Sequence, residues 1–264
     1  MIDSHAHIND EILYKRYDEI IRDAKAAHVN KIIIPGWDIE SSIKAIEIAK
    51  KYDGVYAAVG IHPENIDSCS LDDINIIKEL AKDDKVICIG EIGMDYHYTK
   101  ENSELQKEFF IRQLDLAKEL NLPVEIHLRD CVGDFMDLIR DYIKTRGKRE
   151  NIGVMHSFSE SVEIMNELIS YGFYISLSGP VTFKNARIQK EVATKVRLDR
   201  LLTETDSPYL SPRPLRGTIN EPKNIPLIVK EISSLKEIEE AIIEKATEDN
   251  FDRVFNLKGD KLWV

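Results

Sequence analysis

Short runs of β-branched and other apolar residues alternate along this chain with stretches whose apolar residues recur at helical spacing. Runs of four to six residues that are apolar on both faces are typical of strands buried in a parallel sheet. Seven such runs follow the N-terminal segment. They cover residues 31–35, 55–60, 86–91, 124–127, 152–156, 173–177 and 201–206. A further strand is expected at residues 2–7, which gives about eight strands in all.

The stretches between these runs predict helices. Tyr17, Ile20, Ile21 and Ala24 share one helical face, and the same spacing recurs further along the chain. The later helical stretches cover residues 105–120, 162–169, 225–233 and 238–255. About eight strands with helices between them predict a (β/α)₈ barrel, whose usual size is about 250 residues. We therefore expect an α/β TIM barrel that spans residues 1–264 as a single domain.

A doubly wound sheet is the alternative arrangement of such elements, but no glycine-rich phosphate loop follows the first strand. The chain contains no low-complexity linker and no internal repeat that would mark a domain boundary. Residues 207–226 are rich in proline and glycine and predict a long loop after the last strand.

The motif Asp3-Ser4-His5-Ala6-His7 lies at the start of the first expected strand. Side chains at i and i+2 of an extended strand point to the same face, so both imidazoles would face one ion. Imidazole is among the commonest ligands of borderline metals such as zinc. Two solvated histidines near a chain end are the alternative explanation of this motif.

Metal-ligand residue types recur at the carboxyl ends of the expected strands. In a parallel barrel these ends meet at one mouth, where the active sites of this fold lie. Taken singly, each residue has a structural explanation as a core histidine, a buried ion-pair partner or a turn residue. Together they indicate a site for two divalent ions, since buried acids at one mouth would be costly without cations. The candidates are His5, His7, Glu91, His127, His156 and Asp206.

Weaker candidates flank this set. His62 ends the third expected strand and either faces the mouth or orients a loop. Arg129 follows His127 by two positions, so it points the same way and is a reasonable phosphate clamp. The alternative for Arg129 is a salt bridge to Asp130 or Asp134. His97 is either a substrate contact or a plain loop residue.

Composition restricts the class of protein. A formal net charge of −11 does not attract polyanions, so nucleic-acid contact would be local. Three cysteines, Cys69, Cys88 and Cys131, lack Cys-x-x-Cys spacing and favour a reducing compartment over a thiolate zinc site. No signal sequence and no run of roughly 18 apolar residues is present. We expect a cytoplasmic protein with no membrane association, and favour a monomer.

The chain resembles the TatD family of metal-dependent hydrolases, within the wider amidohydrolase-like superfamily. The matching segments are residues 3–7, 58–63, 90–96, 122–130, 156–159, 178–185, 203–210, 220–222 and 247–251. The resemblance implies that one metal is held by His5, His7, Glu91 and Asp206. It implies a second metal held by Glu91, His127 and His156, with Glu91 bridging the two. It also implies DNA as the substrate, as a single strand or from a 3′ end.

Two departures from the family pattern bear on the substrate. Arg216-Gly217 is followed by Thr218-Ile219, where the family commonly carries Lys and Arg. Ser159 is followed by Glu160, where the family usually has glycine. Neither change touches the expected metal ligands.

These observations predict a two-metal hydrolase, and deoxyribonuclease activity is the function that the resemblance implies. Two divalent ions (Mg, Mn or Zn) can activate a bound water and clamp the attacking and leaving oxygens of a phosphodiester. Asp206 would act as general base, while His62, Arg129 and Arg216 would hold phosphate oxygens. The alternatives are hydrolysis of an amide, lactone or ester of a small metabolite, and a non-catalytic metal-binding adaptor.

Overall fold

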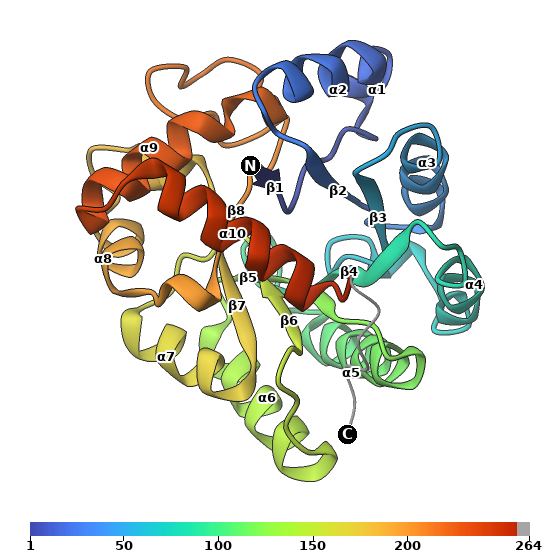
Figure 1. The fold of residues 1–264 in the computed structure, drawn as a ribbon. Coiled ribbons are helices and arrows are strands. Elements are labelled where there is room, and N and C mark those ends of the chain that lie inside the picture. The colour runs from blue at the N-terminus through green and yellow to red at the C-terminus, as the bar shows by residue number, and fades with distance from the viewer. Residues whose placement is uncertain (258–264) are drawn as a thin grey trace.

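The computed structural model describes residues 1–257, and these residues form a (β/α)₈ barrel (Figure 1). Its strands follow one another around the sheet in chain order, and each neighbouring pair that is hydrogen-bonded is parallel. The predicted fold class is therefore confirmed. The strands are β1 (Ile2–Asp3), β2 (Lys31–Pro35), β3 (Val55–Val59), β4 (Val86–Asp95), β5 (Val124–Arg129), β6 (Gly153–Met155), β7 (Phe173–Leu177) and β8 (Leu201–Thr203).

Helices lie around the outside of the barrel, as Figure 1 shows. The helical stretches predicted from periodicity correspond to five of them (α2, α5, α7, α9 and α10) within a residue or a few of the expected bounds. The helices are α1 (Glu11–Tyr14), α2 (Tyr17–Ala26), α3 (Ile39–Ala49), α4 (Asp73–Leu80), α5 (Ser103–Leu120), α6 (Val132–Arg146), α7 (Val162–Tyr171), α8 (Arg187–Lys195), α9 (Ile225–Lys236) and α10 (Glu240–Val254).

Local sequence signals set the bounds of several helices. At the start of α7, the Ser161 hydroxyl accepts a hydrogen bond from the Ile164 N–H at 3.4 Å. Such an N-cap satisfies a donor that the helix itself leaves unpaired. The same helix ends at Gly172, whose φ of 106° favours glycine, and β7 begins at the next residue. Short-range chemistry thus fixes where β7 begins.

The first strand differs from its predicted length. The strand expected over residues 2–7 ends at Asp3 in the structure. Beyond it the chain stays close to β8 because the Ser4 N–H donates to the Thr203 carbonyl at 3.0 Å. Ala6 and Ser207 then form an isolated parallel bridge. These contacts join the first and last strands and close the barrel.

Alternating residues of β2 pack into two different cores. Ile32 and Ile34 of β2 face the surrounding helices, whereas Ile33 faces the barrel interior. Phe251 of α10 packs into the interior cluster. Figure 1 shows α10 lying across this end of the barrel. Polar side chains gather at the opposite end of the barrel, where the strands end.

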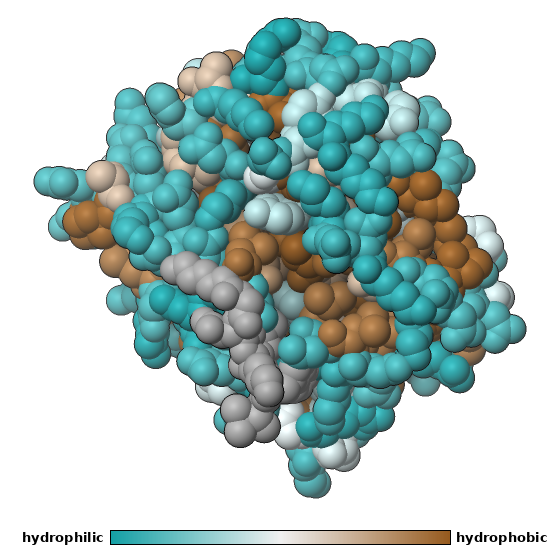
Figure 2. All heavy atoms as spheres, turned by 45° about the vertical axis from the view of Figure 1, so that its right-hand side comes forward, coloured by the Kyte–Doolittle hydropathy of each residue, from teal (hydrophilic) through white to brown (hydrophobic). Residues whose placement is uncertain are grey.

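Figure 2 shows hydrophilic side chains over most of one face, with apolar side chains gathered in patches between them. Within residues 1–257, no helix combines the length and the apolar character needed to cross a bilayer. The predicted long loop after β8 is confirmed up to Glu221, where a short 3₁₀ turn (Pro222–Asn224) leads into α9.

Candidate metal centre

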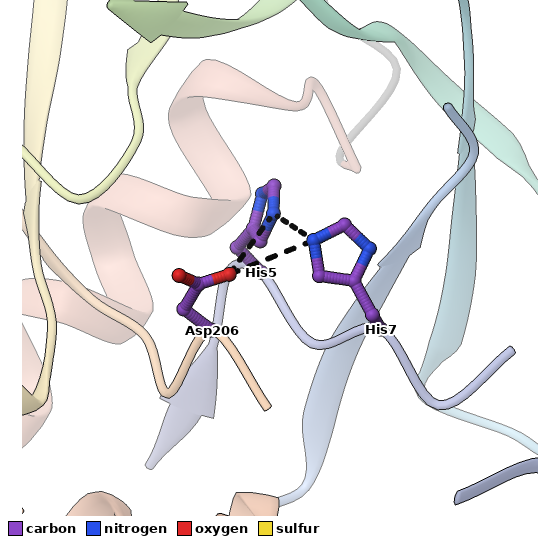
Figure 3. A group of neighbouring side chains, drawn as sticks. All are labelled: His5, His7 and Asp206. Carbon is purple, nitrogen blue, oxygen red and sulfur yellow. Dashed lines mark hydrogen bonds and ion pairs between the residues drawn. The ribbon is translucent and has the colours of Figure 1, made fainter. Parts of the chain in front are cut away.

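His5 and His7 come together with Asp206 at the junction of the first and last strands (Figure 3). Although both histidines lie beyond β1, the His7 N–H donates to the Ser207 carbonyl at 2.8 Å, which keeps this segment beside the chain after β8. The two Nε2 atoms are 3.0 Å apart. Asp206 Oδ1 lies 3.7 Å from His5 Nε2 and 3.5 Å from His7 Nε2. Three donor atoms therefore converge on one point, as the sequence predicted.

Glu91 of β4 lies between two sets of histidines. Its Oε1 lies 3.0 Å from His127 Nδ1 and 3.1 Å from His156 Nε2. Its Oε2 lies 3.5 Å from His5 Nε2 and 3.6 Å from His7 Nε2. The two carboxylate oxygens thus face different imidazoles, an arrangement that suits a bridging carboxylate.

The charge balance of the centre favours ionised acids. Burial raises the pKa of Glu91, but the surrounding imidazoles, His5 and the hydrogen bond with His127 among them, together outweigh burial and hold that pKa well below its usual range. Burial also raises the pKa of Asp206. The hydrogen bond from His7 and the charge of His156 have a larger opposite effect, so the pKa of Asp206 lies below its usual value. These two carboxylates are stable as anions only with positive charge among them, which divalent cations would supply.

The donor set fits metal binding. At metal–ligand bonds of about 2.1 Å, neighbouring donors of a tetrahedral site lie about 3.4 Å apart. The contacts among His5, His7 and Asp206 range from 3.0 to 3.7 Å. Two further groups place their donor atoms within 4.8 Å of one another: His5 with Glu91 and His156, and His62 with Glu91 and His127. Imidazole with carboxylate suits zinc, manganese or iron more than calcium.

His62 differs from the other histidines of the centre. Its Nδ1 accepts a hydrogen bond from the Glu64 backbone N–H at 3.2 Å, so the neutral ring carries its proton on Nε2. That nitrogen lies 3.5 Å from Glu91 Oε1. Burial lowers the pKa of His62, which keeps the ring neutral. This environment favours a hydrogen-bond donor over a metal ligand, in keeping with the predicted role in substrate binding.

Arg129 of β5 lines the cavity above the histidines. The salt bridge to Asp130 or Asp134 that the sequence left open does not form. Asp130 pairs with His97 and Asp134 with Lys107. Within residues 1–257 no ion pair neutralises Arg129, whose guanidinium lies 5.6 Å from the centre of the Tyr98 ring. Its charge is therefore available to an anionic ligand.

Two other candidates lie outside the cavity lining. Arg216 is exposed and its guanidinium lies over the Phe183 ring, 4.5 Å from the ring centre. His97 is largely exposed and its Nδ1 lies 2.8 Å from Asp130 Oδ2. Neither residue is among those that line the cavity. The loop interpretation of His97 agrees with this position, and any contact of Arg216 with a ligand would occur beyond the cavity.

The cavity over the centre has a volume of about 760 Å³ and combines polar and aromatic walls. Trp37, Tyr98 and Tyr209 contribute aromatic surface from three separate loops. Sequence reasoning did not single out these residues, because aromatic residues in loops carry no spacing signal. The cavity can therefore accommodate a ligand with an anionic group next to the metal centre and a flat, partly apolar group against the aromatic side chains.

Sequence reasoning also missed three carboxylates behind the histidines. Asp95 Oδ2 lies 2.8 Å from His127 Nε2, and Glu204 Oε1 lies 3.1 Å from His156 Nδ1. Glu125 Oε1 lies 3.1 Å from His5 Nδ1. A signal was present for two of them, since Glu125 precedes His127 by two positions and Glu204 precedes Asp206 by two.

Comparison with known proteins shows similarity along nearly the whole chain. A family model described as TatD related DNase matches residues 2–256. The uncharacterized metal-dependent hydrolase YabD of Bacillus subtilis is 40% identical over 257 residues, 97% of this chain and 99% of the relative. The uncharacterized metal-dependent hydrolase YcfH of Escherichia coli K12 is 35% identical over 265 residues, covering 99% and 98%. The crystal structure of YjjV, a TatD homolog from Escherichia coli, has a TM-score of 0.89 at 28% identity and covers 97% of this chain and 98% of that one.

Proposed function

Because the chain belongs to the TatD-related DNase family of metal-dependent hydrolases, we propose that it holds two divalent ions and hydrolyses phosphodiester bonds of DNA. The observation that carries the two-ion proposal is the position of Glu91. Its two oxygens face different histidine pairs at 3.0–3.6 Å. A carboxylate shared in this way serves two ions at once.

The ligands divide into two sets that share Glu91. One ion would be held by His5, His7, Glu91 and Asp206, and the other by Glu91, His127 and His156. Such ions, when bound, lower the pKa of water and neutralise developing charge on a phosphodiester.

The other residues of the site have distinct roles in the proposed reaction. Asp206 accepts the proton of the attacking water as general base, because its carboxylate is ionised and faces the cavity. Its φ of 57° is a left-handed conformation that aspartate tolerates and that recurs at functional positions. Arg129 and His62 donate hydrogen bonds to the non-bridging phosphate oxygens.

Several features support a single-stranded or 3′-terminal DNA substrate. Arg129 forms no ion pair with any acid among residues 1–257, and aromatic rings of Trp37, Tyr98 and Tyr209 border the cavity. Bases stack on aromatic rings with little dependence on sequence. A cavity of about 760 Å³ at a barrel mouth is too confined for duplex DNA but admits a nucleotide. The net charge of −11 favours weak, metal-dependent binding.

A second candidate is hydrolysis of an amide, lactone or ester of a small metabolite at the same centre. The observation that favours it is the loop after β8, where Ile219 is 53% exposed and residues 217–221 contain no cation. A loop of this kind contributes little to binding a polyanion.

A turnover panel separates these candidates. The metal-free protein is supplied with Mg²⁺, Mn²⁺ or Zn²⁺ and tested on 3′-labelled single-stranded DNA, duplex DNA and small esters, lactones and amides. The Asp206→Asn variant is the control for contaminating nuclease. We expect metal-dependent loss of the 3′ label from single strands. Hydrolysis of a small ester or lactone without any cleavage of DNA would favour the second candidate, and metal binding without turnover would favour an adaptor.

Restoring charge to the loop after β8 should strengthen DNA binding. The double variant Thr218→Lys, Ile219→Arg adds two cations beside Arg216. Each phosphate neutralised on a single strand contributes about 0.7 to the slope of log affinity against log salt, so two contacts steepen the slope by about 1.4. Fluorescence anisotropy with labelled single-stranded DNA at several salt concentrations measures this slope.

Hydrolysis of a small phosphodiester should be nearly unchanged in this variant, since the metal ligands are untouched. The matched control Ile76→Arg, Thr145→Lys adds the same charges to exposed positions on α4 and α6. Equal DNA affinity in both double variants and the wild type would contradict a path of DNA over this loop.

A further inference from the structure

Glu125 is a fully buried carboxylate below the metal centre. It lies on β5 two positions before His127, and none of its surface is exposed. Its Oε1 lies 3.1 Å from His5 Nδ1, but the two groups are not aligned for a hydrogen bond. Within residues 1–257 neither Glu125 oxygen has a hydrogen-bond partner. A buried carboxylate in this state is costly, so its presence calls for an explanation.

The other two carboxylates behind histidines do not depend on the histidine alone. Glu204 also accepts a hydrogen bond from the Ser157 N–H at 2.6 Å. Asp95 also accepts one from the His97 N–H at 2.7 Å. Backbone donors would keep both acids in place without any contribution from the metal centre. In the described part of the chain no backbone group donates to Glu125, and the polar group beside it is the His5 imidazole.

Glu125 lies beside the His5 ring nitrogen that faces away from the other candidate ligands. Because Nδ1 lies beside Glu125, Nε2 points to His7, Glu91 and Asp206. A carboxylate behind a ligating imidazole fixes the ring's tautomer and orientation and raises its basicity.

We propose that Glu125 is a positioning residue that orients His5 and strengthens it as a metal ligand, at a cost to the stability of the metal-free protein. This inference rests on the proposed metal-binding function of the same site. It predicts opposite effects of one substitution. Removing the carboxyl group eliminates two buried oxygens that have no hydrogen-bond partner within residues 1–257, but weakens the ligand when metal is bound.

The test substitutes Glu125→Met, which keeps an unbranched chain of similar volume, and Glu125→Gln, which keeps an oxygen acceptor without the charge. Urea unfolding midpoints of the metal-free proteins report stability. Competition with a chromogenic chelator reports affinity for Zn²⁺ and Mn²⁺. We expect Glu125→Met to unfold at a urea concentration equal to or above that of the wild type, and to bind metal 10–100-fold more weakly, the usual effect of removing such a partner. Glu125→Gln should retain part of that affinity.

Asn250→Leu is the matched control for a purely structural role. Asn250 is buried on α10 and donates hydrogen bonds to the Leu198 and Leu201 carbonyls, at the start of β8. This variant should lose stability without a change in metal affinity per folded molecule. Wild-type metal affinity in both Glu125 variants would overturn the inference. It would also be overturned if the metal-free Glu125 variants lost as much stability as Asn250→Leu. A wild-type protein that binds neither ion would overturn the proposed function, and this inference with it.

Discussion

Replacing Glu91 with glutamine is expected to abolish metal-dependent turnover. The change preserves the shape of the side chain but removes the charge that the two proposed cations would share. A neutral amide cannot offset two cations in a buried site, where Glu91 is 3% exposed. Loss of several kcal/mol of metal-assisted stabilisation of the transition state corresponds to a decrease in kcat/KM of about 10³-fold or more.

This prediction is checked by steady-state kinetics with saturating metal, together with elemental analysis of the purified variant. Because one carboxylate serves both ligand sets, Glu91→Ala should lower activity more than removal of any single histidine. Glu108→Gln, the same chemical change at an exposed position of α5, is the control. Turnover by Glu91→Gln close to that of the wild type would refute the bridging role.

Removing both histidines of the N-terminal motif is expected to strip one ion from the protein. The double variant His5→Ala, His7→Ala eliminates two of the donors that converge with Asp206, leaving the His127 and His156 side in place. Metal content measured after dialysis should fall from about two ions per chain to about one, since His127, His156 and Glu91 would still hold the second ion.

Chelators should also abolish turnover by the wild-type protein, and added divalent metal should restore it. The control for the histidine variants is His97→Ala, which removes an exposed imidazole outside the cavity. Full metal content in the His5→Ala, His7→Ala protein would show that the motif does not bind metal.

The elements that the sequence predicted well are those whose signal is local. β2 and β7 have the predicted bounds because each is a compact apolar run closed by proline, glycine or serine. β1 was predicted to reach residue 7 but ends at Asp3. A strand continues only where its neighbour supplies a regular series of hydrogen bonds. The chain after β8 forms isolated hydrogen bonds with His5 and His7 and no continuous ladder.

The charged contacts of Arg129 and Arg216 were beyond sequence reasoning for a similar reason. Nearby acids suggested a salt bridge for Arg129, yet Asp134 lies closer to Lys107, which is on a different helix. Arg216 was expected among the substrate contacts, but its guanidinium lies over Phe183 and outside the cavity lining. Which charges remain unpaired depends on side chains from distant segments.

The sequence by itself determined that the candidate ligands at the strand ends lie at one mouth of the barrel. Strand and helix periodicity predicts the barrel, and in a barrel the carboxyl ends of all strands meet. His5 and Asp206, about two hundred residues apart in the chain, were grouped on this basis, and their side chains lie 3.7 Å apart. Only the tertiary structure decided which Glu91 oxygen faces which histidines and which carboxylate stands behind each imidazole. Such contacts depend on the register between β1 and β8 and on side-chain rotamers that packing sets. Neither the register nor the rotamers can be predicted from residues that are adjacent in sequence.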